Sequence, residues 1–244
     1  MTALSTLNPT AYRARIHRDG FAVVEGVLSP ERVEGLRAAI AALPEGEEVR
    51  RRKDVYGVRN LLEISPAVSE LAASTEIRGL VMPVLGPECF AVRATFFDKV
   101  PDANWKLRWH QDSVIAVKRR VDVPGFGAWS DKAGVLQVRP PEAVLAEMLA
   151  IRVHLDDCPG TNGPLRILAG THTRRWPRED IGAAKAAFRE VACEVGLGGV
   201  LAMRPLVLHA SSPAEVPGHR RVIHLEFAHQ PLPDGLEWKQ EIGA

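Results

Sequence analysis

Three features are missing from this 244-residue chain: long hydrophobic runs, a cysteine framework and a surplus of one charge. No segment approaches the roughly 18 to 20 consecutive apolar residues of a membrane-spanning helix, so we expect a soluble protein. The N-terminal segment lacks a basic region followed by an apolar one, which favours the cytoplasm over export. The formal net charge of +1 gives no electrostatic reason to expect nucleic acid. We therefore expect a small-molecule partner for a monomer or homodimer that binds neither nucleic acid nor membrane.

The cysteines are few and scattered. Cys89, Cys158 and Cys193 are odd in number, and none of them lies in a Cys-x-x-Cys spacing. Such a set argues against a disulfide framework and against a thiolate metal site. We expect three reduced, buried thiols.

The order of helical and strand patterns predicts a mainly β fold with a helical buttress. Helix signals dominate residues 1–88, where a Ser-Pro pair twice opens a run with apolar residues at helical spacing. From 89 to 230, short runs rich in β-branched and aromatic residues alternate with turns. Helices followed by many short strands favour a double-stranded β-helix, the jelly-roll core of cupin-like proteins. With 46% apolar residues, the whole chain, 1–244, can form one domain.

Turn residues predict one hairpin and one long loop. Residues 151–156 alternate cleanly and residues 165–168 return after a Pro-Gly-Thr-Asn-Gly-Pro turn, which indicates a hairpin. Residues 121–141 contain six glycines and prolines with little periodicity, and a loop of this length is typical of a lid over a binding site. The Lys-Arg-Arg run at 118–120 is typical of a solvated charge cluster, or at most of a rim that attracts acidic substrates.

Pairs of a histidine and an acid at strand spacing are the first candidates for chemistry. Three occur: His110-x-Asp112, His154-x-Asp156 and His224-x-Glu226. Residues i and i+2 of a strand face the same way, so each pair can present an imidazole and a carboxylate to one metal ion. The first pair ends an apolar strand just before the expected lid, whereas the other two lie inside well-patterned strands. We therefore favour the first pair, and interpret the third as a hydrogen-bonded pair.

A second histidine would complete a metal site. His209 ends the long apolar run 200–208 and is therefore either a capped core residue or a ligand. Two histidines and one carboxylate are the ligand set of non-haem Fe(II) oxygenases. Arg220 follows eleven positions later and lies beside His209 if residues 210–219 form a hairpin-like return. A guanidinium in such a cavity needs an anion and pairs best with a carboxylate.

Together, these motifs resemble the phytanoyl-CoA dioxygenase family of Fe(II)/2-oxoglutarate oxygenases. The resemblance covers about residues 90–228 and rests on four elements in order: Trp-His-Gln-Asp at 109–112, Asn-Gly-Pro-Leu at 162–165, Gly-Thr-His at 170–172, and a distal histidine with an arginine eleven residues on. It implies an enzyme that uses Fe(II), 2-oxoglutarate and O2, and that releases succinate and CO2. The implied reaction is hydroxylation of an aliphatic C–H in an acyl-CoA, an amino acid or a natural-product intermediate.

The resemblance also assigns roles to particular residues. It implies that His110, Asp112 and His209 are the catalytic iron ligands. Arg220 would bind the distal carboxylate of 2-oxoglutarate with help from Ser211. The neighbouring Arg221 competes for that role, but the family spacing selects Arg220. Because an aspartate stands at 112 rather than a small residue, the resemblance favours hydroxylation over halogenation.

Five further residues are candidates for contact with cosubstrate or substrate. Arg152 stands where family members can place an aromatic residue against the cosubstrate, and His154 shares its strand face. A cavity role and a solvated, salt-bridged face stay open for these two. Arg59 and Lys99 fall near positions where the family can contact cosubstrate or substrate, although a surface cation is the commoner role of such residues. Trp109 completes the set of candidate substrate residues.

Two other classes of function stay open. A jelly roll can keep its fold as a non-redox module that binds a metal or a small molecule, because fold does not establish function. A hydrolase using Ser211 with His209 and Asp112 fits less well, since nothing resembles a nucleophile elbow. Composition carries no code that identifies the substrate.

Overall fold

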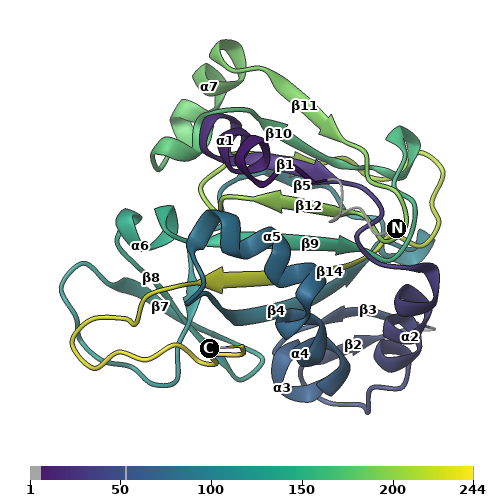
Figure 1. Cartoon of the computed structure of the whole chain (residues 1–244), viewed down its shortest axis with the longest axis horizontal. Coiled ribbons are helices and arrows are strands. Elements are labelled where there is room, and N and C mark those ends of the chain that lie inside the picture. The colour runs from purple at the N-terminus through teal and green to yellow at the C-terminus, as the bar shows by residue number, and fades with distance from the viewer. Residues whose placement is uncertain (1–6, 53, 244) are drawn as a thin grey trace.

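The computed structural model describes residues 7–52 and 54–243 (Figure 1). Its largest sheet has seven strands in the order β1 (Phe21–Val24), β12 (Val200–Met203), β9 (Leu149–His154), β14 (Arg221–Ala228), β4 (Phe90–Asp98), β3 (Val55–Val58) and β2 (Val49–Arg51). A four-stranded sheet has the order β11 (Glu190–Cys193), β10 (Leu165–Leu168), β13 (His209–Ser211) and β5 (Leu107–His110). These two antiparallel sheets form the double-stranded β-helix that the strand pattern predicts.

The helices are concentrated in the N-terminal third, as expected. They are α1 (Pro9–Asp19), α2 (Pro30–Ala41), α3 (Leu61–Ile64), α4 (Pro66–Ala73), α5 (Thr75–Leu85), and later α6 (Glu142–Ala146) and α7 (Ile181–Ala187). Both Ser-Pro pairs begin helices, and the Ser29 hydroxyl caps α2 by accepting from the backbone N–H of Arg32. Within the described ranges, no helix is long and apolar enough to cross a bilayer.

Helices α1 to α5 cover the outer face of the large sheet, with α4 and α5 in front of β14 and β4 in Figure 1. Apolar residues of these helices share one buried cluster with Ile151 and Val153 of β9 and with Ile223 and Leu225 of β14. Side chains alternate along a strand, so the residues between them point to the inner face. The inner face therefore carries the polar residues of β9 and β14, and it faces the four-stranded sheet.

The expected lid at 121–141 is an ordered hairpin, so the loop prediction was wrong. Strands β7 (Gly127–Lys132) and β8 (Val135–Arg139) pair with each other, and β8 also pairs with β6 (Ile115–Ala116) in a third sheet. Buried Val138 and half-buried Trp129 pack in an apolar cluster with Trp238 near the C-terminus. Tertiary packing thus orders this segment, although its glycines and prolines make its short strands hard to recognise in the sequence.

The two predicted hairpin returns are crossings between sheets. Strand β9 belongs to the seven-stranded sheet and β10 to the four-stranded one, so residues 151–156 and 165–168 do not pair. Residues 210–219 likewise lead from β13 to β14 in the other sheet. Strands β9 and β10, and likewise β13 and β14, lie in different layers, which turn residues alone do not reveal.

Gly163 lies at the crossing between β9 and β10, and we expect its replacement by alanine to destabilise the fold. Its φ is +59°, and a Cβ there would stand 2.6 Å from the carbonyl oxygen of Ser212. We expect Gly163→Ala to lower the free energy of unfolding in urea by about 1 to 3 kcal/mol. Gly182→Ala is the control, because a Cβ at this position in α7 meets nothing within 4 Å. Equal losses in the two variants would contradict this account.

Candidate active site

A cavity of about 510 Å³ opens between the two larger sheets, with the β7–β8 hairpin as part of its wall. Its walls combine inner-face residues of β3, β4, β9 and β14 with residues of β5, β10 and β13. The predicted metal ligands and Arg220 all line this one cavity. The hairpin contributes Lys132, Val135 and Gln137 to it, so the segment expected to be a lid does lie beside the site.

Three side chains with metal-binding atoms meet in the cavity. His110 ends β5, His209 begins β13, and the two residues are directly opposite each other in the pairing of these strands. Their ring centroids are 4.2 Å apart. Asp112 lies two residues beyond the end of β5, where its backbone N–H donates to the carbonyl oxygen of Pro205 at 2.9 Å. One ligand atom from each of the three residues lies within 4.8 Å of the others.

Backbone hydrogen bonds orient both imidazoles for metal binding. The Nδ1 of His110 lies 2.8 Å from the carbonyl oxygen of Arg108, and the Nδ1 of His209 lies 2.9 Å from that of Val207. A carbonyl only accepts, so each Nδ1 carries the proton and each Nε2 keeps a free lone pair. Both Nε2 atoms face Asp112, each 3.9 Å from one of its carboxylate oxygens. Two imidazoles and one carboxylate therefore converge with their metal-binding atoms close to one another, which fits the donor set of a non-haem Fe(II) centre.

The charge states of these ligands suit a cation as well. Burial lowers the pKa of His209 to about 4, so this imidazole is neutral at pH 7. Burial raises the pKa of the Asp112 carboxyl, but the nearby histidines His209, His224 and His110 outweigh it and hold this pKa below its usual range. Asp112 is therefore a carboxylate at neutral pH.

His224 is a third histidine beside Asp112, and hydrogen bonding distinguishes it from the other two. Its Nε2 lies 3.9 Å from a carboxylate oxygen of Asp112. Its Nδ1 lies 3.1 Å from a guanidinium nitrogen of Arg152, which can only donate. Nε2 of His224 therefore carries a proton, and it lies 3.3 Å from the Glu226 carboxylate. The structure thus contains the expected hydrogen-bonded pair of His224 and Glu226, and its Nε2 has no free lone pair for a metal.

A cluster of buried cations lies in the same interior. Arg220 is 6% exposed, Arg152 is 9% exposed and Lys99 is 1% exposed. The Lys99 ammonium donates to the Ser211 hydroxyl at 3.1 Å and to the Ser212 carbonyl oxygen at 2.6 Å. Arg220 donates to the carbonyl oxygen of Gly163. None of these three cations has a carboxylate hydrogen-bond partner among the described residues.

Burial lowers the pKa values of all three cations. Burial, and then the charge of Arg220, lower the pKa of Lys99 to about 7. Burial, and then Arg220, likewise lower the pKa of Arg152 to about 10. Buried cations are tolerated when an anion pairs with them. The cluster is therefore arranged for an anionic ligand, and the hydroxyl of Ser211 is placed to share it.

The remaining predicted residues fall in three different places. Arg59 lines the cavity. His154 is buried on the inner face of β9 beside the arginine cluster, but it is not a lining residue, and neither of its ring nitrogens has a hydrogen-bond partner among the described residues. Trp109 packs in a small apolar cluster with Trp176 and Leu208, outside the cavity. The structure thus gives no support to Trp109 as a substrate contact, because its neighbour His110 takes the inner face of β5.

Several lining residues were not expected from the sequence. Lys99, a predicted candidate for contact with cosubstrate or substrate, is not a lining residue itself, but its ammonium is buried against Ser211, so the alternative of a surface cation is wrong. The side chains of Arg93 and Thr95 line the cavity because they share the inner face of β4 with Phe97. Gln137 comes from the hairpin that was expected to be a loop. Alternation along residues 90–98 could have revealed the β4 set, whereas Gln137 had no signal of its own.

Comparison with known proteins agrees with this geometry. Residues 16–222 match the family model described as phytanoyl-CoA dioxygenase (PhyH). The chain belongs to this family. Over 192 residues it is 30% identical to an ectoine dioxygenase of Nocardia farcinica, a match that covers 74% of this chain and 56% of that protein. The chain spans about half the length of the curated relatives that it matches.

Solved structures share the fold of this PhyH-family chain. EctD from S. alaskensis with bound Fe has a TM-score of 0.70 at 18% identity, covering 91% of this chain and 76% of that chain. The epimerase SnoN in complex with Fe3+, alpha ketoglutarate and nogalamycin RO has a TM-score of 0.68 at 18% identity, covering 91% of this chain and 84% of that chain. These likenesses confirm the predicted jelly-roll core with its helical additions.

Proposed function

We propose that this protein is an Fe(II)/2-oxoglutarate-dependent dioxygenase that hydroxylates an aliphatic C–H of a small molecule. One observation carries the proposal: a complete two-histidine, one-carboxylate donor set and a buried cation cluster without a counter-ion share one cavity. The first suits a divalent metal and the second suits a dicarboxylate. A metal-binding module without redox chemistry would need only the first.

His110, Asp112 and His209 would hold the metal, and Arg220, Ser211 and Lys99 would hold the distal carboxylate of 2-oxoglutarate. When bound, the iron centre supplies activation of O2, coupled to oxidative decarboxylation of the 2-oxo acid to succinate and CO2 with transfer of one oxygen atom to the substrate. The backbone carbonyls of Arg108 and Val207 fix the two imidazole tautomers. Asp112 contributes a negative charge that offsets part of the charge of the metal.

Arg152 and His224 would set the polarity beside the metal ligands. Arg152 donates to His224, and His224 in turn donates to Glu226, so the imidazole is held from both sides. We propose that the Arg152 guanidinium also contacts the cosubstrate, because it lines the cavity and lies close enough to both Asp112 and Arg220 for their charges to shift its pKa. His154 would support Arg152 from the same strand face rather than bind substrate.

The reaction type follows from the ligand set and from the relatives. An aspartate completes the donor set, which leaves no position in the protein's own ligands for a halide and favours hydroxylation. The relatives include an ectoine dioxygenase, while the structural neighbours include an epimerase and a carbocyclase. We infer a small-molecule substrate for this chain. We also infer that residues 1–244 form one dioxygenase domain.

Turnover of the cosubstrate tests the proposal. With Fe(II), O2 and a mixture of candidate small molecules, we expect conversion of 2-oxoglutarate to succinate in equal amount to the oxidised product. An apo protein treated with a chelator should be inactive, and activity should return with Fe(II) but not with Mg²⁺. Succinate formation that persists in the chelated protein would contradict the proposal.

Lys99 should make the affinity for 2-oxoglutarate depend on pH. Its pKa of about 7 lies below the value of 10.5 for a free lysine, so the apo protein loses this charge as the pH rises above 7. A bound carboxylate raises the pKa again, and binding then takes up a proton. Above pH 7 the Kd should therefore rise by up to about tenfold per pH unit, since one proton is linked to binding. Arg220 and Arg152 lie close enough to Lys99 to lower its pKa, and their guanidinium groups keep their charge over this range.

The matched variant is Lys99→Met, which keeps an unbranched side chain through the Cε position and removes the charge. We expect a weaker affinity for 2-oxoglutarate in this variant that no longer changes between pH 6.5 and 8.5. The apo form should also be more stable than the parent below pH 7, where burying the ammonium costs free energy. Calorimetric titration at four pH values measures both Kd and proton uptake. An unchanged slope in Lys99→Met would assign the pH dependence to another group.

A further inference from the structure

The cavity has a surplus of positively charged side chains that binding of the metal and the cosubstrate does not neutralise. Six cationic residues line it against two acidic ones, Glu48 and Asp112; the cations are Arg50, Arg59, Arg93, Lys132, Arg152 and Arg220. The whole chain has a net charge of only +1, so this surplus is local. A divalent metal and a dicarboxylate cancel each other in charge. Their binding therefore leaves the surplus of the cavity in place.

Part of the surplus is already matched, and two of the remaining cations lie at one side of the cavity, whereas Lys132 comes from the β7–β8 hairpin. Arg93 forms an ion pair with Glu226. Arg152 and Arg220 belong to the buried cluster described above. Among the described residues, the side chains of Arg50 and Arg59 have neither a hydrogen-bond nor an ion-pair partner, and the carboxylate of Glu48 turns back toward Gly46. Two arginines at the β2–β3 edge of the sheet are thus free to bind an anion.

The strand register shows where these arginines stand relative to the metal ligands. Arg152 pairs with His224 across β9 and β14, and His224 pairs with Thr95 across β14 and β4. Val58 pairs with Phe96, so Arg59 leaves β3 at the level of Thr95. Arg152, His224, Thr95 and Arg59 thus form one row across the inner face. Neighbouring strands are about 4.8 Å apart, which places the Arg59 backbone about 10 Å from that of His224 beside the metal ligands.

The space along this row suits an organic molecule with polar groups. Gly57, opposite Phe97 in the pairing of β3 and β4, has no side chain and leaves room beside Arg50. Phe97 and Trp105 give the cavity apolar walls. The hydroxyl of Thr95 and the amide oxygen of Gln137 are buried without a hydrogen-bond partner among the described residues. A buried polar atom without a partner costs free energy unless a ligand satisfies it.

We propose that the substrate is an organic acid whose carboxylate binds Arg59 and Arg50, while its carbon skeleton extends along Thr95 and Phe97 toward His110, Asp112 and His209. The inference rests on the proposed function and deepens it by naming the substrate class. Charge pairing at the outer end of the row positions the C–H to be oxidised at the inner end. A guanidinium fork discriminates a carboxylate from a neutral amide of the same shape.

A pair of simple probes tests the proposal. The probes are 3-phenylpropanoate and 3-phenylpropanamide, which share an apolar body and differ in the charged group. Each is titrated calorimetrically into anaerobic protein saturated with Fe(II) and 2-oxoglutarate, so that the Arg220 side of the cavity is already filled. We expect the acid to bind about tenfold to a hundredfold more tightly than the amide, as a charge-assisted hydrogen bond implies.

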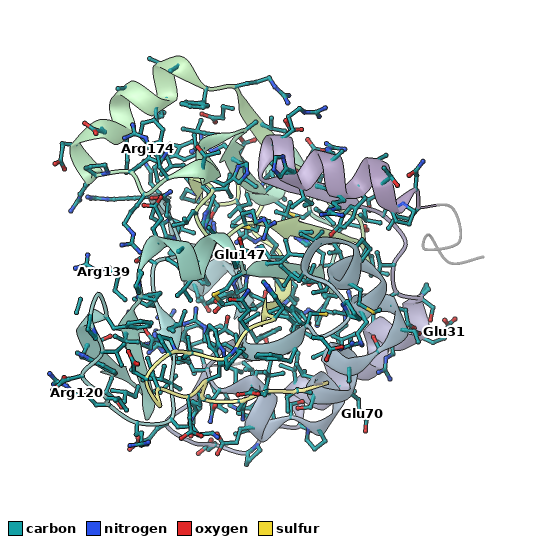
Figure 2. The ribbon with its side chains drawn as sticks, turned by 60° about the vertical axis from the view of Figure 1, so that its left-hand side comes forward. Glu31, Glu70, Arg120, Arg139, Glu147 and Arg174 are labelled. Atoms are coloured by element: carbon teal, nitrogen blue, oxygen red, sulfur yellow. The ribbon has the colours of Figure 1, made fainter. Side chains whose placement is uncertain are left out.

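Two variants locate the effect. Arg59→Gln should remove most of the preference for the acid and leave the affinity for the amide unchanged. The control is Arg120→Gln, because Arg120 projects from the outer edge of the molecule in Figure 2 and forms an ion pair with Asp122 away from the cavity. That variant should keep the full preference, which also separates the cavity arginines from the charged run at 118–120. Thermal unfolding of each variant checks that its fold is intact.

The outcomes separate the two proposals. The visible charge-transfer band of the Fe(II) and 2-oxoglutarate complex is recorded on each sample before titration. If the band is absent in the parent protein, the proposed function fails. If the band is present but the acid does not bind, binds no better than the amide, or keeps its preference in Arg59→Gln, the organic-acid inference alone fails.

Discussion

Replacing Arg220 by leucine is expected to raise the Kd for 2-oxoglutarate by about thirtyfold to several thousandfold. Truncating one partner of a buried charge pair costs about 2 to 5 kcal/mol of binding free energy, and about 1.4 kcal/mol corresponds to a factor of ten. Arg220 is 6% exposed, and its guanidinium donates to a carbonyl oxygen and not to a carboxylate. We therefore expect the cosubstrate to supply the anion that pairs with this charge. Burial also lowers the pKa of Arg220, because a buried cation without a hydrogen-bonded anion costs free energy. The unfolding free energy of the apo variant should therefore be unchanged or higher.

Arg221 provides a matched control one residue away. Its guanidinium forms two hydrogen bonds with the Asp156 carboxylate, at 2.9 and 2.6 Å, on the opposite face of the strand. Arg221→Leu should lower the free energy of unfolding by about 1 to 3 kcal/mol and leave the Kd for 2-oxoglutarate unchanged. Calorimetric titration and urea unfolding of both variants separate a binding role from a structural one. If Arg221→Leu weakened cosubstrate binding as much as Arg220→Leu, the assignment by strand alternation would be wrong.

The second large effect is expected at Asp112. Asp112→Ala removes the only carboxylate of the donor set, and we expect succinate formation to fall by about a thousandfold because the metal no longer binds in a competent geometry. Metal analysis of the purified variant should show the loss of iron in parallel. Glu70→Ala is the control, because Glu70 projects outward from α4 in Figure 2 and is exposed.

This variant also decides against the competing classes of function. A hydrolase that used Ser211, His209 and Asp112 would not need a metal, so activity of the parent protein that persists without iron and is lost in Asp112→Ala would revive that interpretation. A non-redox binding module would lose metal in the variant but would form no succinate in either protein. Only an oxygenase loses both iron and succinate formation together.

The sequence predicts the fold well where local signals agree with the tertiary structure. Ser29 and Pro30 begin α2 as expected, because a hydroxyl cap and a proline at the first turn act locally. The crossing after β9 was misinterpreted as a hairpin, because a Gly-rich turn does not indicate which sheet receives the next strand. The hairpin at 127–139 was missed because its order depends on packing against Trp238, far along the chain.

The site was predictable in part for a similar reason. His110 and Asp112 stand close together in sequence, but their meeting with His209 depends on the pairing of β5 with β13, which no spacing reveals. The family resemblance implied that His110 and Asp112 lie beside His209, and the structure places the three residues together. Lys99 could not be distinguished from a surface lysine, because its burial comes from the segment after β13 that covers it. The tautomer that separates His224 from the ligand histidines is likewise visible only in the hydrogen bonds.

An anaerobic titration of Fe(II) and 2-oxoglutarate, followed by visible absorption, tests the central claim most directly. The parent protein should develop a weak charge-transfer band that saturates at one equivalent of metal. His110→Ala should show no band, and Arg220→Leu should require a higher concentration of 2-oxoglutarate to reach it. No band in the parent protein, or an undiminished band in His110→Ala, would contradict the assignment of this cavity as an iron and 2-oxoglutarate site.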